Sequence, residues 1–177
     1  MVVNPELEPG EIEVVTHRDP WSAAGKGDAD TVLTWLKEFP TDVDELDSVN
    51  RSILVQACFS GNTSLVRDLL ALGANVNVVT DGNFPTPLSA AITVQDIPLV
   101  SLLLEHGANP CIPNFRGDTA FHHAVMHPTF LEILLARHPN VEMVNQKNCF
   151  NETPMDVAVE MGIIRSYELL VWYLDRK

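Results

Sequence analysis

The chain has 177 residues, 46% of them hydrophobic, and its 24 acidic and 11 basic side chains give a formal net charge of −13. This length suits one compact domain or a short repeat array, and the apolar content excludes wholesale disorder. The acidic balance argues against binding nucleic acid or an anionic membrane, because both need clustered Lys and Arg. It favours a protein partner with a basic surface.

The cellular compartment is predicted from the cysteines and from the first residues. Three scattered cysteines do not make a disulfide framework, which favours a reducing compartment. Residues 1–17 carry four Glu and no Lys or Arg, unlike a secretory or transit peptide. The longest apolar runs, of about six residues, are too short to span a bilayer. We therefore expect a cytoplasmic protein, with the nucleus as the other open location, and no membrane partner.

The N-terminal segment, residues 1–17, is predicted to be an acidic tail ahead of the folded part. Two arrangements are open for it. It is either flexible or lies back across the first folded unit, with Ile12, Val14 and Val15 packing there.

From Arg18 onward, one phrase recurs at a nearly constant spacing. Thr86-Pro87-Leu88 and Thr153-Pro154-Met155 are its plainest copies, and a small pair such as Ala91-Ile92 follows within a few residues. Weaker copies give repeat starts near 18, 52, 86, 119 and 153, which are 34, 34, 33 and 34 residues apart. Such a period indicates stacked supersecondary units, none of which can bury its apolar face alone.

Each repeat is predicted to contain two helices. The starting Thr caps the first helix, and a Pro directly after it suits the first turn. A later apolar stripe, such as Val66…Leu69-Leu70, predicts a second helix, which Gly73 ends where a positive φ is needed. Residues 77–86 and 111–119 are rich in turn-forming residues and predict protruding turns.

The period and these phrases resemble those of the ankyrin repeat family over residues 18–177. The resemblance implies an all-α solenoid of five helix–turn–helix units with protruding hairpin fingers. It also implies a non-enzymatic interaction module, acting as an adaptor, scaffold or inhibitor. The fourth repeat departs from the pattern, because Met126-His127-Pro128 replaces the Gly between its helices. We therefore expect an irregular fourth unit with a shortened first helix.

The resemblance implies that partners bind along the finger tips and the adjoining inner helices, at positions set by the register of each repeat. Four of the seven Phe fall on these positions, whereas random placement would send most Phe to the core. Aromatic and Met side chains inside an acidic rim are typical of interface anchors. The predicted partner-binding residues are Val49, Arg51, Phe59, Asn83, Phe84, Phe115, Arg116, Met126, His127, Cys149, Phe150 and Met161.

The last predicted helix, within residues 163–174, is apolar on more than one face, although terminal repeats normally show a polar outer face. Three explanations are open: the helix docks on a partner, it self-associates through Trp172 and Tyr173, or those two residues fold onto the fourth unit. An alternative function follows, in which the protein is a structural subunit of a large permanent assembly, anchored by this helix.

Candidate chemistry is sparse. His122, His123 and His127 are the cluster with metal-ligand character, but the helical motif supplies neither a third ligand nor a general-base Glu. The resemblance instead makes His122 a structural histidine, and it marks Asn77 as a position that is hydroxylated in family members. We predict no catalytic residues, no metal and no cofactor.

Overall fold

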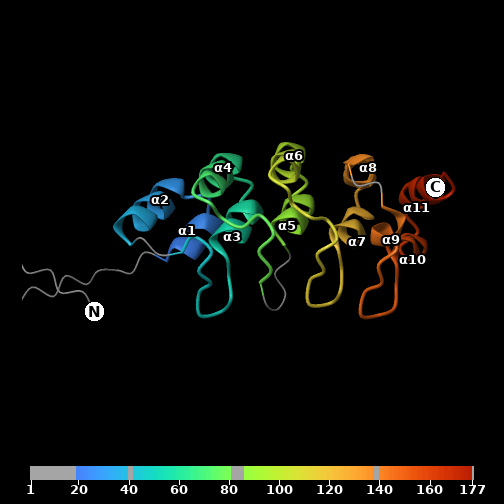
Figure 1. Cartoon of the computed structure of the whole chain (residues 1–177), viewed down its shortest axis with the longest axis horizontal. Coiled ribbons are helices and arrows are strands. Elements are labelled where there is room, and N and C mark those ends of the chain that lie inside the picture. Colours follow the sequence, from blue (N-terminus) through green and yellow to red (C-terminus); the bar gives the residue numbers. More distant parts are fainter. Residues whose placement is uncertain (1–18, 40–41, 81–85, 138–139, 177) are drawn as a thin grey trace, which may run out of the picture.

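The computed structural model describes residues 19–39, 42–80, 86–137 and 140–176 of the chain. The predicted acidic tail, residues 1–17, therefore lies outside the described residues. Figure 1 shows the described part as a row of helical pairs with loops projecting from one side. The prediction of an all-α solenoid is confirmed.

The helices follow the predicted order of a first and a second helix in each unit. The first two units contain α1 (Pro20–Gly25), α2 (Ala29–Glu38), α3 (Ile53–Phe59) and α4 (Thr63–Ala71). The third and fourth contain α5 (Pro87–Thr93), α6 (Ile97–Glu105), α7 (Ala120–Ala124) and α8 (Pro128–Arg137). A short helix, α9 (Val141–Val144), precedes the last pair, α10 (Pro154–Glu160) and α11 (Ile164–Leu174).

Short polar side chains fix where the helices begin. Thr86 and Thr153 cap α5 and α10 as predicted, and a Pro occupies the first turn of each. The second helices have caps that the sequence pattern did not indicate. Asn62 Oδ1 accepts a hydrogen bond of 3.0 Å from the Leu65 N–H, and Asp96 Oδ1 accepts one of 2.9 Å from the Leu99 N–H. Each cap satisfies an N–H that has no partner within the helix.

The helices form two layers (Figure 1). The first helices α1, α3, α5, α7 and α10 contact one another in sequence, and the second helices lie across them. The core fills the space between the layers and between successive units. Its small members Ala57, Ala91, Ala124 and Ala158 are buried, which lets neighbouring first helices approach closely.

The fourth unit is irregular, as the sequence predicts. Its first helix, α7, has 5 residues, whereas α3, α5 and α10 have 7 each. The shortening follows from Pro128, which begins α8 and cannot donate a hydrogen bond to a continuing α7. In the third unit, Gln95 replaces the expected Gly and adopts a left-handed φ of 59°. The turn between α5 and α6 therefore keeps its shape without glycine.

Candidate protein-interaction surface

Three described fingers, which are the loops that project from the helical layers, close with the same side-chain motif. An Asp or Asn at the start of each tip accepts hydrogen bonds from the second and fourth backbone N–H groups that follow it. Asp47 Oδ1 accepts from Val49 and Arg51 at 3.0 and 2.7 Å. Asn114 Oδ1 and Asn148 Oδ1 make the corresponding bonds at 2.9 to 3.0 Å. This motif fixes the backbone of each tip.

In the same tips, the residue three positions after the Asp or Asn has a left-handed backbone conformation. These residues are Asn50, Gly117 and Asn151, with φ values of 59°, 77° and 65°. Asn and Gly tolerate this region of φ better than other residues. The resulting turn leaves the tip side chains in solvent, because Val49, Phe115 and Phe150 are 62%, 54% and 63% exposed.

Neighbouring fingers are joined to each other. Asn148 Nδ2 donates to Asp118 Oδ1 at 2.9 Å, and the Cys149 N–H donates to the Arg116 carbonyl at 2.7 Å. Gly117 lies so close to the next finger that a Cβ there would be 3.0 Å from the Asn148 Cα. These contacts fix the two fingers relative to each other, and the fingers carry the predicted site residues Phe115, Arg116, Cys149 and Phe150.

The predicted site residues of these two fingers are all exposed. The Arg116 guanidinium carbon lies 5.4 Å from the centroid of the Phe115 ring, close enough for a cation–π contact. Cys149 has a free, exposed thiol. The pair of fingers therefore offers a cationic, an aromatic and a thiol-bearing side chain to a partner.

Arg51, predicted to bind a partner, is held by two carboxylates of its own chain. Its Nε lies 2.6 Å from Asp47 Oδ2, and its terminal nitrogen lies 3.1 Å from Asp19 Oδ2 in the preceding unit. Burial acts to raise the pKa of Asp47, but hydrogen bonds from Arg51 and Val49 and the charge of Arg51 outweigh it, so the pKa is lowered. The geometry gives Arg51 a structural task at the first finger.

The inner-helix predictions have mixed outcomes. Met126 and Met161 are exposed at the ends of α7 and α10, and His127 is half-buried beside the Phe130 ring, with centroids 6.1 Å apart. Phe59 is half-buried and packs against the core, so less of its ring is open than predicted, and its role in binding stays a prediction. Asn83 and Phe84 lie outside the described residues.

His122 has the structural role that the resemblance implies. The Thr119 N–H donates to Nδ1 at 3.1 Å, so the ring proton sits on Nε2, which lies 3.1 Å from the Glu152 carbonyl and donates to it. Burial lowers the pKa of His122 and of His123, which favours neutral rings. Within the described residues, no three His, Cys, Asp or Glu side chains are placed to hold a metal ion together.

Asn77 is also part of the scaffold between units. Its Nδ2 donates to the Gly107 carbonyl at 3.1 Å, and its Oδ1 accepts from the Asn109 N–H at 2.8 Å. Both bonds run to the next unit, so Asn77 helps to fix the register of the second unit on the third.

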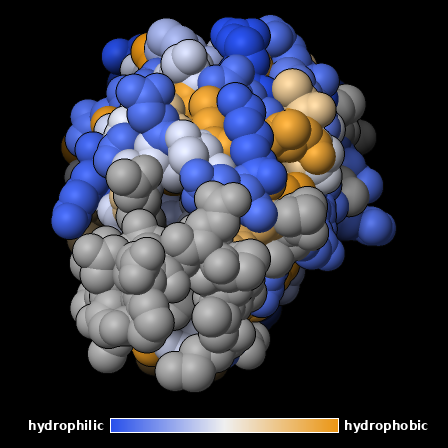
Figure 2. Space-filling model, turned by 90° about the vertical axis from the view of Figure 1, so that its left-hand side faces the viewer, coloured by the Kyte–Doolittle hydropathy of each residue, from blue (hydrophilic) through white to orange (hydrophobic). Residues whose placement is uncertain are grey.

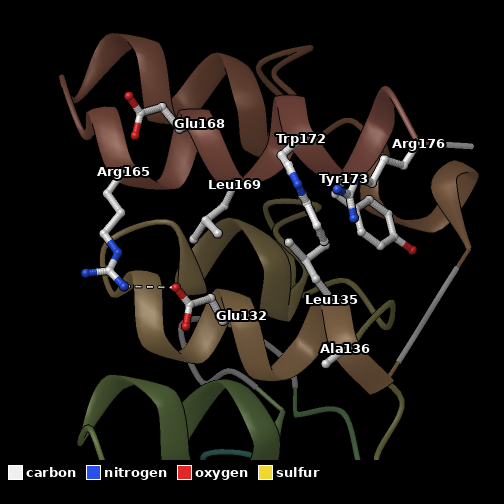
Figure 3. A pocket seen from close by; sticks show the side chains of 9 residues that line it. All are labelled: Glu132, Leu135, Ala136, Arg165, Glu168, Leu169, Trp172, Tyr173 and Arg176. Atoms are coloured by element: carbon white, nitrogen blue, oxygen red, sulfur yellow. Dashed lines mark hydrogen bonds and ion pairs between the residues drawn. The ribbon is translucent and has the colours of Figure 1, made fainter.

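A groove of about 780 Å³ lies between α8 and α11. Figure 3 shows Leu135, Leu169 and Trp172 along it, with the 3.0 Å ion pair between Arg165 and Glu132 at one end. Trp172 is exposed beneath the Arg176 guanidinium. Tyr173 is only 6% exposed, so the prediction that it serves docking or self-association is wrong: the ring is already part of the core.

The motif at the finger tips escaped the sequence prediction. Its signal was present, because Asp47, Asp81, Asn114 and Asn148 stand five residues before the start of successive repeats. Short acidic or amide side chains at a constant register favour such turns.

The fold and the surface together define a class, that of solenoid proteins which present loops and inner helices to other proteins. A family model for ankyrin repeats, in three copies, matches residues 21–114, which is more than half of the chain. The protein therefore belongs to the ankyrin repeat family, whose repeats are protein–protein interaction modules. Among the described residues, no helix is long and apolar enough to cross a membrane.

Several curated proteins are similar to the chain. Human BCL-6 corepressor-like protein 1 is 35% identical over 99 residues, which are 55% of this chain and 5% of that protein. Cyclin-dependent kinase inhibitor 2A of Monodelphis domestica is 28% identical over 128 residues, 72% of this chain and 71% of the inhibitor. Human 2-5A-dependent ribonuclease is 38% identical over 69 residues, 39% of this chain and 9% of that protein. The chain thus spans a small part of the corepressor-like protein and the ribonuclease.

Proposed function

We propose that this protein is a non-catalytic adaptor, scaffold or inhibitor that binds a partner protein with a basic surface through its finger tips and inner helices. The observation that carries the proposal is the shared tip motif. It holds apolar side chains in water at three fingers, where Val49, Phe115 and Phe150 are each more than half exposed.

The physical reason is preorganisation. A tip that is already fixed by hydrogen bonds loses little conformational entropy when a partner covers it, so more of the contact energy remains for binding. An exposed aromatic ring near the centre of an interface is a frequent hot spot, contributing about 2 kcal/mol or more on truncation. The two joined fingers that carry Phe115 and Phe150 are the strongest candidates for such anchors.

Charge supplies the proposed partner chemistry. The net charge of −13 attracts a basic surface and speeds its association, and this effect weakens as salt is added. The likeness to a protein named cyclin-dependent kinase inhibitor 2A supports the role of an inhibitor. A non-catalytic array would inhibit by occupying a surface of its partner. A reducing compartment, cytoplasmic or nuclear, is supported by three free cysteines.

The test replaces the two aromatic anchors. Phe115→Ser combined with Phe150→Ser should abolish partner capture in affinity purification with mass spectrometry, while the helical circular dichroism signal stays unchanged. Leu72→Ser is the matched control, because Leu72 is also exposed but is the C-cap residue of α4 and not part of a finger tip. A partner set that the double variant retains would refute the finger-tip assignment, and a loss that Leu72→Ser also causes would show non-specific capture.

A second candidate function is a structural subunit of a permanent assembly, anchored by α11. The half-exposed Trp172 in the α8–α11 groove favours it. This function requires the purified chain to aggregate or to need its assembly partners for solubility. A monodisperse monomer in size-exclusion chromatography with light scattering would exclude it.

A further inference from the structure

Residues at equivalent positions of successive units are buried alike, but some of these positions are uncovered in the last described unit. The second residue of each small pair is buried wherever another described unit follows. In the second, third and fourth units this residue is Cys58, Ile92 or Val125, and each is 0% exposed. In the last unit the same position is Val159, which is 62% exposed.

The second helices repeat the observation. The first residue of each Val-x-x-Leu-Leu stripe is fully buried in the middle units, at Val66, Val100 and Leu131. Its counterpart in α11 is Tyr167, which is 40% exposed, and Ile164 one turn earlier is 71% exposed. Ile164, Tyr167 and Val171 are three and four residues apart and therefore share one face of the helix.

We name this surface the end face and define it as Val159 on α10 with Ile164, Tyr167 and Val171 on α11. Figure 1 shows α10 and α11 at the end of the row, with no described element beyond them. Figure 2 views the opposite end, where hydrophilic residues surround a hydrophobic area on the described surface. Val159 and Tyr167 stand at positions that a stacked unit covers elsewhere in the array, and Ile164 and Val171 extend the apolar surface beside them.

The end face is distinct from the α8–α11 groove. Arg165 and Arg176 line that groove, where Arg165 pairs with Glu132 and Arg176 lies 4.1 Å from the Trp172 ring centroid. Arg165 on α11 and Arg176, two residues after its end, therefore both belong to the groove (Figure 3).

Acidic residues flank the end face. Asp175 follows Val171 by four residues and is exposed, and Asp156 and Glu160 are exposed on α10. In the middle units the register position of Asp156 holds Val55, Ser89 and His122, all of which are buried, and His122 Nε2 lies 3.1 Å from the Glu152 carbonyl of the following unit. Hydrogen bonds from Thr153 lower the pKa of Asp156, and the nearby Lys147, which donates to Asn151, adds to this effect. Asp156 therefore stays charged where a covering surface would lie.

We propose that the end face binds a helical hairpin of another protein, which stacks on it as a further unit and carries Lys or Arg opposite Asp156, Glu160 and Asp175. A second copy of this chain fits poorly. Pairing two end faces would bring together two surfaces with acidic flanks, and Arg165 and Arg176 line the α8–α11 groove instead of supplying the complementary positive charge. The proposal is independent of the finger-tip function, because the two surfaces share no residue.

The test uses two defined probes with the full chain. Each is a designed three-repeat ankyrin protein whose first helical pair lacks a polar cap, so that its apolar face is open. One probe carries Lys at the positions that would face Asp156, Glu160 and Asp175, and the other carries Glu there. Fluorescence anisotropy at low salt should show the Lys probe binding at least about tenfold more tightly than the Glu probe.

Variants locate the binding. The double variant Ile164→Asp and Tyr167→Ser should lower the affinity for the Lys probe at least about tenfold, because both side chains lie in the middle of the surface that the probe would bury. Ile97→Asp, at the same register on α6, is the control and should leave the affinity within about twofold. Equal binding of both probes, no binding of either, or binding that survives the double variant would overturn the proposal. So would a dimer of the chain alone that the double variant dissociates, because a second copy would then be the occupant.

Discussion

Replacing Asn148 by Ala should loosen the two fingers that carry the proposed anchors. The Asn148 side chain is almost wholly buried and makes four hydrogen bonds. Its Oδ1 accepts from the Phe150 and Glu152 N–H groups at 3.0 Å, and its Nδ2 donates to Asp118 at 2.9 Å and to Glu152 at 3.2 Å. Alanine removes all four bonds and leaves the backbone of the tip undefined.

The magnitude follows from the bonds and their exposure. A hydrogen bond contributes about 1 kcal/mol net, and more where one partner is charged, as Asp118 and Glu152 are. The freed groups lie at the surface, where water partly replaces the lost partners. We therefore expect Asn148→Ala to lower the free energy of unfolding by about 2–3 kcal/mol. Urea unfolding followed by circular dichroism measures this directly.

Asn148→Asp separates the two halves of the network. It keeps both acceptor bonds but places a carboxylate against Asp118 and Glu152, so at pH 7 it should destabilise the protein at least as much as alanine does. Because the added loss comes from repulsion between like charges, it should shrink as salt is added.

Two results would refute this reasoning. One is a change of less than about 0.5 kcal/mol for Asn148→Ala, which is the range of an ordinary surface substitution. The other is an aspartate variant as stable as wild type at pH 7. Either would mean that the joined fingers do not depend on the Asn148 side chain.

Three further predictions concern single sites. Gly117→Ala should lower the free energy of unfolding, measured with urea, more than Gly73→Ala does. Both glycines have a positive φ, but of the two only a Cβ at Gly117 would meet backbone, 3.0 Å from the Asn148 Cα. Equal effects would contradict the close contact between the fingers. Burial lowers the pKa of His122, so the unfolded chain binds the proton at a higher pH than the folded protein does. The free energy of unfolding should therefore decrease as the pH is lowered below about 6.5, and it should decrease less in His122→Gln. The same pH slope in both proteins would contradict a neutral His122 ring. A maleimide should label Cys149 alone in the folded protein, because Cys58 and Cys111 are buried, and mass spectrometry showing more than one adduct would contradict their burial.

Much of the candidate surface was predictable from register. Exposure of Val49, Phe115 and Phe150 follows from their positions relative to the repeat start, because every finger leaves the helical layers at the same point. The irregular fourth unit followed from Pro128, a local and strong constraint on the backbone. The register alone did not indicate that the Phe59 ring packs partly against the core, because that contact depends on neighbouring residues.

The amino-acid sequence by itself determined the helical pairs, their order and the family, because those depend on local propensity and on a period that five copies reinforce. Only the tertiary structure decided what each side chain meets. It pairs Arg51 with Asp19 of another unit, buries Tyr173 in the core and leaves Val159 open at the end of the array. Such outcomes depend on which distant segments of the chain pack beside a residue, and the stacking of the units determines this.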